Sequence, residues 1–347
     1  MPGLLAFAIA LISSLALTLP VRQFALRVGM VDRPGPRKVH LEPIPLLGGL
    51  AIYFGVVLAM LLSSGGEAVR QVAGILGGAT LVILVGTLDD RGMLHHQIKL
   101  FLGMPFAGLI LLASDIHAQV FSTFLHGRAG FLCDAALTVF WVTGITASFS
   151  ILDYMDGLCA GVAAIAALFF CIFAMLNGQV LVSTLAAAVL GAALGFLRWN
   201  FNPAKIFMGD GGAMCLGFLM ATLALKLRLD DSSRAAEWIV PVLVLGAPIF
   251  DTLMVSISRS RRGLLPFATP GKDHTGHRLA NCGLGTRRAV VSMYALGGFF
   301  GSLALWVARL SSWRAAGIAT IVALVALAAV AALERAPYER QQAKRSL

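Results

Sequence analysis

Long apolar stretches recur along this chain of 347 residues and constrain its fold more than any other feature. A helix needs about 20 predominantly apolar residues to cross the hydrocarbon core of a bilayer. Such stretches occur at about 3–21, 47–64, 70–88, 98–114, 131–150, 157–176, 180–197, 211–227, 238–257, 289–309 and 313–333. The sequence therefore predicts an all-α, polytopic integral membrane protein with about eleven transmembrane helices.

The composition supports a membrane protein and excludes several other classes. Charged residues make up 13% of the chain, about half of the share that is typical of soluble domains. A soluble domain of this length needs more charged residues to cover its surface. The five cysteines are scattered and lack zinc-site or disulfide-framework spacing. We therefore exclude a secreted disulfide scaffold, a disordered chain and an ordinary cytosolic enzyme.

The basic residues predict how the helices are oriented. With eleven spans the termini lie on opposite sides, and 20 of the 27 Lys and Arg residues fall in one alternate set of loops and the C-terminal tail. Because cytoplasmic loops carry the excess of basic residues, we place the N-terminus outside and the C-terminus in the cytoplasm. The net charge of +10 then reflects topology and an anionic substrate, and no nucleic-acid partner is predicted. We expect one transmembrane domain, 1–336, and a basic cytoplasmic tail, 337–347.

Two pairs of carboxylates stand at ends of apolar stretches on the predicted cytoplasmic side. Asp89 and Asp90 are adjacent in GTLDDRG, and Asp153 and Asp156 are three residues apart in ILDYMDGL. Adjacent carboxylates repel each other unless a cation or a proton lies between them, and Mg²⁺ prefers carboxylate and phosphate oxygens. A spacing of three puts both groups on one helix face. The alternatives are a solvated helix end for the first pair and helix capping for the second.

A glycine-rich segment, NFNPAKIFMGDGG, follows the stretch at 180–197. Glycines let the backbone approach a phosphate, and Asp210 stands at the start of the next predicted helix, where it can bind a metal that bridges phosphates. The alternative is a glycine-rich turn with an aspartate cap.

Two basic loops complete the predicted cytoplasmic face. Loop 258–288 holds seven basic residues besides His274 and His277, and loop 22–46 contains Lys38 and His40 among several prolines. A cationic loop near carboxylates suits a diphosphate with Mg²⁺, although charge that only sets topology remains the alternative. Asp251, inside the stretch at 238–257, suits a structural hydrogen bond as well as a direct role. Together the motifs predict a cytoplasmic site for a phosphorylated, metal-bound substrate.

These motifs resemble those of the polyprenyl-phosphate N-acetylhexosamine-1-phosphate transferases, glycosyltransferase family 4. VDRPGPRKVHLEPIPLLGG, GTLDDR, DYMDGLCAG, NFNPAKIFMGDGGAMCLG and KDHTGHRL follow the order of the family's motifs over about residues 26–290. The segment Ile44-Pro45-Leu46-Leu47-Gly48-Gly49 replaces the threonine-containing segment of the pentapeptide-type enzymes, which favours the GlcNAc-1-phosphate transferase branch.

The resemblance implies a reaction. A UDP-amino sugar, with GlcNAc expected, gives its sugar-1-phosphate to undecaprenyl phosphate in the inner membrane and releases UMP, as a first membrane step of cell-envelope polysaccharide synthesis. The cofactor is Mg²⁺, with Mn²⁺ as a substitute. The resemblance leaves open whether the acceptor attacks directly or through a covalent aspartyl step, and whether the protein forms homo-oligomers.

The resemblance also implies roles for residues. Asp89 and Asp90 act on the lipid phosphate, Asp153 lies beside the metal and phosphates, and these three are the catalytic set. Asp210 binds the metal, with Ser150 as a further ligand. The substrate-binding set is Lys38, His40, Asp156, Asn200, Phe207, His274, His277 and Arg278, with Asn200 and Phe207 at the uracil.

The sequence departs from the family pattern before Asp153. The two asparagines usual there are Ala147 and Ser150, so a ligand or donor is lost at one position and shortened at the other. Three alternatives therefore stay open: transfer of another UDP-amino sugar, a non-catalytic family member, and a membrane transporter, for which Asp251 is the motivating residue.

Overall fold

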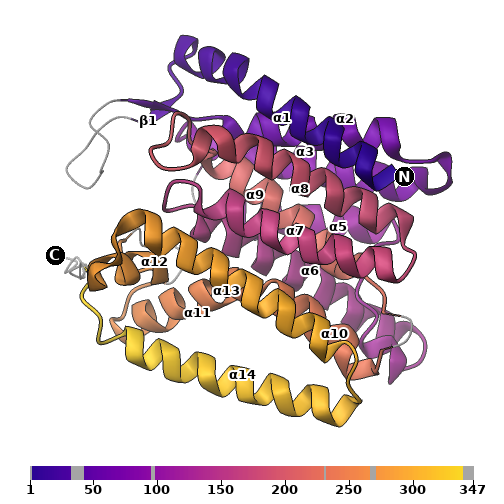
Figure 1. The fold of residues 1–347 in the computed structure, drawn as a ribbon. Coiled ribbons are helices and arrows are strands. Elements are labelled where there is room, and N and C mark those ends of the chain that lie inside the picture. The colour runs from indigo at the N-terminus through magenta and orange to yellow at the C-terminus, as the bar shows by residue number, and fades with distance from the viewer. Residues whose placement is uncertain (1, 33–42, 95–97, 230–231, 266–270, 339–347) are drawn as a thin grey trace. The chain divides into compact units, whose positions relative to one another are not determined.

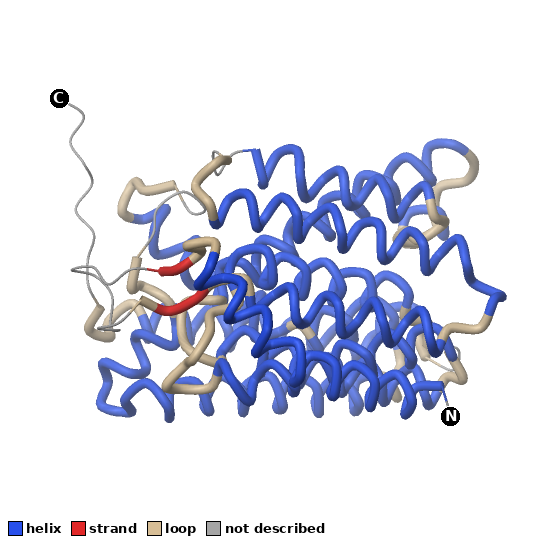
Figure 2. Tube along the Cα trace, turned by 90° about the horizontal axis from the view of Figure 1, so that it is seen from above, coloured by secondary structure: helices blue, strands red, loops and turns tan. Residues whose placement is uncertain are grey.

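The computed structural model describes residues 2–32, 43–94, 98–229, 232–265 and 271–338, and these are almost entirely helical (Figure 1). Two short strands, β1 (Val31–Asp32) and β2 (Ile44–Pro45), pair antiparallel and appear in red in Figure 2. The all-α prediction is thus confirmed. By its internal contacts the chain divides into two compact units, Met1–Arg228 and Leu229–Leu347. The single domain 1–336 stays a prediction, and most of the tail 337–347 lies outside the described residues.

The first unit holds eight of the longer helices. In chain order they are α1 (Pro2–Arg27), α2 (Gly48–Ser63), α3 (Val69–Asp90), α5 (Met104–Ala113), α6 (Arg128–Leu152), α7 (Leu158–Leu176), α8 (Val180–Asn200) and α9 (Gly209–Lys226). Single turns link some of them, namely η1 (Gly66–Ala68), the π-helical η2 (Lys99–Gly103) and η3 (Phe121–Thr123).

The second unit is built from α10 (Arg234–Val244), α11 (Gly246–Arg261), α12 (Thr275–Leu279), the π-helical η4 (Ala280–Leu284), α13 (Gly285–Val307) and α14 (Ser312–Leu333). Most of α14 is apolar and exposed, with Ile321, Leu324 and Val325 each about three-fifths exposed. An apolar face of this kind is expected where a helix contacts lipid.

The lengths of the helices support a multi-pass membrane protein. Within the described ranges seven helical segments are long and apolar enough to cross a bilayer, and α10 with α11, bent by 71° at their break, add an eighth if they cross together. Helix α2 and the segment Lys99–Ala113 are apolar but shorter. The predicted stretches coincide with helices, while the count of eleven spans and their orientation stay predictions.

Helix α9 is the centre of the first unit. Its residues from Gly211 to Leu225 are all buried, and it packs against α2, α3, α6, α7 and α8. A helix that is apolar on all sides is stable only when other elements surround it. Its first turn approaches two neighbours closely, because a Cβ added to Gly49 of α2 or to Gly86 of α3 would lie within 2.5 Å of the α9 backbone. The start of α9, and with it Asp210, is therefore fixed by backbone-to-backbone contact.

Helices α1 and α8 lie side by side and run in the same direction (Figure 1). A Cβ at Gly191 would lie 2.3 Å from the Phe7 carbonyl oxygen, and one at Gly195 would lie 2.5 Å from that of Leu11. This glycine pair, four residues apart, is the small-residue spacing that lets membrane helices approach closely. The packing brings the C-terminal ends of α1 and α8 together.

Candidate active site

The paired aspartates at the end of α3 meet the first turn of α9. Asp90 accepts hydrogen bonds from the backbone N–H groups of Asp210, at 2.9 Å, and of Gly211, at 3.3 Å. These are N–H groups at a helix N-terminus, which lack partners within their own helix and attract anions. Gly209 has a φ of +75°, and a Cβ there would lie 2.5 Å from the Asp90 carboxylate. The glycine before Asp210 therefore allows this junction to form.

Lys99 joins the two carboxylate motifs. Its ammonium group lies 2.6 Å from the Asp89 carboxylate and 2.7 Å from that of Asp210. Lys99 is not among the predicted site residues. The available signal was a lone lysine at the edge of an apolar stretch, nine residues after Asp90, where an ionisable group is costly without a partner.

Ser150 and Asp210 are joined across two helices. The Ser150 hydroxyl, near the end of α6, donates a hydrogen bond of 2.7 Å to the second oxygen of Asp210. The side chain that stands in place of a usual asparagine thus still contacts the predicted metal ligand. Ala147, one helical turn earlier, is 5% exposed and supplies no polar group.

Asp153 differs from its neighbours because no hydrogen bond to its carboxyl group is found among the described residues. It follows the last residue of α6, and its carboxyl group lies deep among protein atoms although part of the residue stays accessible. Burial, and then the negative charges of three nearby aspartates beginning with Asp210, raise the pKa of Asp153 to about 8. At neutral pH and without a bound metal, this carboxyl group therefore holds a proton most of the time.

Asp156 and Asn200 fix the loop between α8 and α9. The Asp156 carboxylate accepts hydrogen bonds of 3.0 Å from the Asn202 side chain and from the backbone N–H of Ala204. The buried Asn200 side chain accepts from the Gly157 N–H and donates to the Ile206 carbonyl, each at 3.0 Å. Both residues were predicted to bind substrate. In the structure they order the loop around the expected nucleotide site, and their contact with substrate stays a prediction.

Phe207 connects this loop to the segment after β2. Its N–H donates to the Pro45 carbonyl at 2.8 Å, and its carbonyl accepts from the Gly48 N–H at 3.0 Å. The two motifs around Gly48 and Phe207 are about 160 positions apart in sequence but form one structural unit. Lys38 and His40, from the same N-terminal motif, lie outside the described residues.

The donor groups near Asp210 suit a hard cation. Mg²⁺ is commonly held by one or two carboxylates together with substrate phosphates and water, and Asp210 is contacted by another oxygen group, the Ser150 hydroxyl. In the part of the chain that the structure describes, no group of three or more His, Cys, Asp or Glu side chains is arranged to hold a metal by itself. The residues therefore fit a metal that the substrate helps to bind.

The remaining predicted residues belong to a network in the second unit. Asp251, fully buried, accepts a hydrogen bond of 2.8 Å from the Thr275 N–H and lies 3.0 Å from His274 Nδ1. The rings of His274 and His277 lie edge to face, 6.2 Å apart. Asp251 thus has the structural role that was one of the two interpretations of its sequence position, and it holds His274.

Arginine–aspartate pairs form the other half of this network. Arg259 contacts both oxygens of Asp273, at 3.0 and 2.8 Å, and Arg262 contacts the same carboxylate. Burial alone would raise the pKa of Asp273, but the two guanidinium groups lower it to about 2. The carboxylate is therefore charged at any physiological pH.

Arg278 is fully buried at the centre of this network. Its guanidinium donates to the Ser258 hydroxyl, the Leu333 carbonyl and the Glu334 carboxylate at 2.7–2.8 Å, and it lies 3.7 Å from the centre of the Tyr338 ring. Arg278 was predicted to bind substrate. Here its contacts join α12 to the end of α14, and a substrate contact stays a prediction.

Comparison with known proteins agrees with the motifs. Residues 72–228 match glycosyl transferase family 4. A probable undecaprenyl-phosphate N-acetylglucosaminyl 1-phosphate transferase of Bacillus subtilis is 36% identical over 89% of this chain and 86% of its own length. A decaprenyl-phosphate N-acetylglucosaminephosphotransferase of Mycolicibacterium smegmatis is 32% identical over 79% of this chain and 74% of its own.

A third relative, an undecaprenyl-phosphate alpha-N-acetylglucosaminyl 1-phosphate transferase of Yersinia pestis, is 28% identical over 80% of this chain and 77% of its own. Together the fold and the relatives define a membrane-embedded sugar-phosphate transferase. The chain belongs to glycosyl transferase family 4, and the family resemblance found in the sequence is confirmed, as is the expectation that the protein is a phosphotransferase.

Proposed function

We propose that this protein transfers N-acetylglucosamine 1-phosphate from a UDP-sugar to undecaprenyl phosphate in the inner membrane and releases UMP. An oxygen of the acceptor phosphate bonds to the sugar-linked phosphorus, and the bond from that phosphorus to the UMP oxygen breaks. One observation carries the proposal: Asp89, Lys99 and Asp210 form a continuous chain of contacts at the end of two helices. The names of the relatives support the sugar and the acceptor.

The excess of carboxylates supports a metal-dependent reaction. Asp153 lies close enough to Asp90 and Asp210 to feel their charge, and Lys99 supplies one compensating charge to Asp89 and Asp210. We propose that Asp210 and the Ser150 hydroxyl hold Mg²⁺ together with the donor phosphates. When bound, the ion offsets negative charge on the transferring phosphoryl group.

Asp153 is the group best suited to exchange a proton. In the metal-free protein its pKa of about 8 lies close to neutral pH, where a carboxyl group can both accept and give up a proton. Asp90 is held by two N–H groups and Asp89 by Lys99. Because these two carboxylates are already bonded, we propose direct attack by the acceptor phosphate, with Asp89 and Asp90 positioning Lys99 and the start of α9.

The remaining residues of the motifs are proposed to contact the two substrates. When substrate binds, Lys99 exchanges one of its carboxylate partners for a phosphate of the acceptor or the donor. Asn200, Phe207 and Asp156 shape the nucleotide site. His274 and His277 act on the diphosphate or the sugar, with Lys38 and His40 as further phosphate contacts.

A transfer assay tests the function. Purified protein receives Mg²⁺, undecaprenyl phosphate and one radiolabelled UDP-amino sugar at a time. We expect UMP release and lipid-linked label with UDP-GlcNAc. Folded protein that forms no product from any sugar would contradict the proposal, and product from a different sugar alone would correct the donor.

Labelling of cysteines tests the cytoplasmic placement of the site. Arg91 follows α3 and Arg70 lies in its first turn, and both are exposed. In a cysteine-free background we expect R91C to resist a membrane-impermeant maleimide in intact cells and to react in inverted vesicles, with the reverse for R70C. The opposite pattern would invert the proposed orientation.

A further inference from the structure

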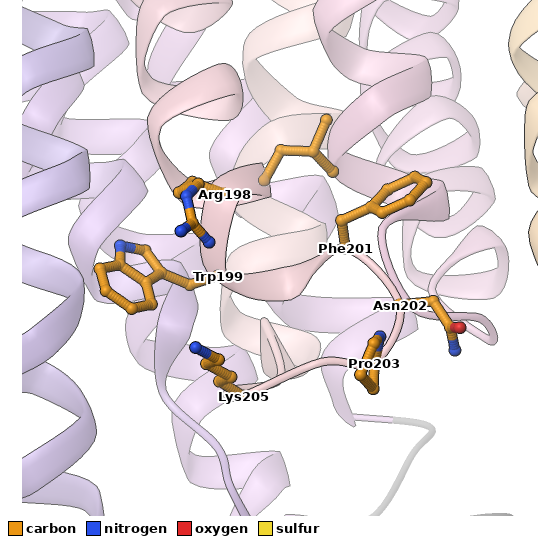
Figure 3. Close-up of a pocket in the computed structure, with 7 residues that line it drawn as sticks. Arg198, Trp199, Phe201, Asn202, Pro203 and Lys205 are labelled. Carbon is orange, nitrogen blue, oxygen red and sulfur yellow. The ribbon is translucent and has the colours of Figure 1, made fainter.

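A hollow of about 350 Å³ lies at the C-terminal end of α8, beside the proposed active site. It is lined by Leu197, Arg198, Trp199, Phe201, Asn202, Pro203 and Lys205. In Figure 3 the side chains of Arg198, Trp199 and Lys205 gather on one side of the loop, and Phe201 lies on the other. Its volume falls within the range of about 300–1,000 Å³ that small-molecule sites occupy.

The backbone around this hollow is fixed from several directions. The Lys205 N–H donates to the Trp199 carbonyl at 2.9 Å, and the Lys205 carbonyl accepts from the Arg22 side chain of α1 at 3.1 Å. Asp156 holds the opposite side of the loop through Asn202 and Ala204. The lining is thus a built structure and not a set of unrelated surface side chains.

Positive charge converges on this hollow. Arg198 and Lys205 both lie over the Trp199 ring, with their charged groups 5.4 and 5.5 Å from its centre. Among the described residues no carboxylate lies within ion-pair distance of Arg198, Lys205 or the nearby Arg22. Two cations that share one ring, with no counter-ion among the described residues, create a field that attracts an anion.

The hollow lies where the surface of the membrane is expected. Helix α8 has 21 residues and ends at Asn200, which at 1.5 Å per residue gives about 30 Å, the thickness of the hydrocarbon core. The Trp199 indole N–H donates to the Leu15 carbonyl of α1 at 3.1 Å, so the ring is held at the junction of two apolar spans. Tryptophan and basic residues favour this depth, where phospholipid headgroups lie.

We propose that the hollow formed by Arg198, Trp199 and Lys205 binds the phosphate of an anionic phospholipid headgroup. Charge complementarity selects the phosphate, and the depth of the ring at the end of α8 selects a lipid over a soluble anion. The site is separate from the transferase chemistry. It anchors the ends of α1 and α8, and through Lys205 the loop that carries Asn200 and Phe207.

Native mass spectrometry of the purified full-length protein tests this site. The protein is delipidated in detergent and titrated with dioleoyl phosphatidylglycerol or dioleoyl phosphatidylcholine. We expect one phosphatidylglycerol to bind about tenfold more tightly than phosphatidylcholine, because two cations face the headgroup. The variant R198Q/K205Q should lose this preference. Equal binding of the two lipids by the wild-type protein would overturn the proposal without any variant.

A matched pair elsewhere in the chain serves as the control. Arg314 lies over the ring of Trp313 at 5.0 Å in the second unit, so R314Q removes the same type of contact without changing a residue that lines the hollow. We expect R314Q to keep the preference for phosphatidylglycerol. If R314Q loses it to the same extent, general surface charge explains the binding and the proposed site is wrong. K205Q alone keeps the backbone bonds of the loop and should lose part of the preference, provided that its circular dichroism is unchanged.

A competition experiment separates the phospholipid from the acceptor lipid. Undecaprenyl phosphate is added in equimolar amount to wild-type protein that carries phosphatidylglycerol. We expect the phosphatidylglycerol to stay bound, because the acceptor occupies the aspartate site. Displacement of the phosphatidylglycerol, together with weaker binding of undecaprenyl phosphate itself to R198Q/K205Q than to wild type, would assign the hollow to the acceptor and overturn the phospholipid assignment.

Discussion

The two clusters of charged side chains in this protein have opposite charge balances. In the first unit, aspartates from α3, α9 and the α6–α7 connection lie near one another, and one described lysine, Lys99, contacts two of them, Asp89 and Asp210. In the second unit, Asp251, Asp273 and Glu334 each contact a histidine or an arginine. Buried charges without full compensation are costly and are usual at functional sites, whereas compensated ones hold a scaffold together. The charge balance therefore favours chemistry at the first cluster, whereas the ion pairs of the second stabilise that unit and position His274, whose action on the substrate is part of the proposed function.

The largest expected effect is on turnover in the first cluster. D210N removes the charge that contacts both Lys99 and Ser150, and we expect the rate of UMP release to fall about 1,000-fold. D134N is the control, because Asp134 is also buried but accepts hydrogen bonds from three backbone N–H groups in a turn. D134N should lower stability and keep turnover per folded molecule. Full activity in D210N would contradict the placement of the chemistry in the first cluster.

The largest expected effect on stability is in the second cluster. R278A leaves Glu334 and the Leu333 carbonyl without their buried donor, and we expect the free energy of unfolding to fall by about 3–5 kcal/mol. R261A is the control, since Arg261 is 68% exposed and lies 4.0 Å from the same Glu334. Thermal unfolding in detergent measures both. Equal effects of the two substitutions would show that the network is not what stabilises the unit.

Asp273 predicts a dependence of stability on acid pH. Its pKa in the folded protein, about 2, lies below the ordinary value of 3.8, so its charge stabilises the fold above about pH 4 and this contribution is lost as pH falls toward 2. We expect D273N to be about 2 kcal/mol less stable than the wild type at pH 7, with the difference shrinking between pH 4 and 2. A difference that is constant across this window would contradict the assignment.

For Asp153 we expect stability to change with pH in the opposite direction. Its folded pKa of about 8 lies above 3.8, so wild-type stability falls as pH rises from about 4 to 8, because the folded state must give up a proton that burial favours. D153N removes this fall, and we expect it to be about 1–3 kcal/mol more stable than the wild type at pH 8 in metal-free buffer, with little difference at pH 4. Denaturant unfolding at the two pH values tests this. A loss of stability at pH 8 would show that Asp153 is compensated.

The smallest expected effect is at Ser150. S150N restores the amide that is usual in the family, and its longer side chain reaches further toward Asp210. We expect the Mg²⁺ concentration for half-maximal activity to fall about threefold, because an amide carbonyl oxygen then replaces the hydroxyl as a ligand and no longer has to give up its hydrogen bond to Asp210. An unchanged Mg²⁺ dependence would remove Ser150 from the metal site and leave it as a hydrogen-bond donor to Asp210.

Much of the candidate site follows from sequence because helix ends place its residues. Asp90 and Asp210 are each adjacent to an apolar stretch, so both had to lie near the end of a span. Lys99 was not predicted, since its two partners are 10 and 111 positions away and only the packing of α3 on α9 brings them together.

Arg278 shows that a residue predicted from sequence to bind substrate can have structural partners that the sequence does not reveal. Its position in a basic loop predicts a phosphate ligand, but the Leu333 carbonyl and Glu334 lie 55 and 56 residues further along the chain. No local pattern identifies that partnership. The bend of 71° between α10 and α11 falls beside Gly246 and Pro248, which interrupt the apolar stretch at 238–257, but its size follows only from the packing.

The sequence by itself determined that this chain is helical and apolar enough for a bilayer, and which aspartates and histidines stand at helix ends. Periodicity, hydropathy and motif spacing are local properties, and they sufficed to place the chain in its family. The tertiary structure decided which charges compensate one another. Charge balance depends on distances between residues far apart in sequence, and helix packing alone leaves one cluster with more carboxylates than described cations while it places the acidic groups of the other beside basic side chains.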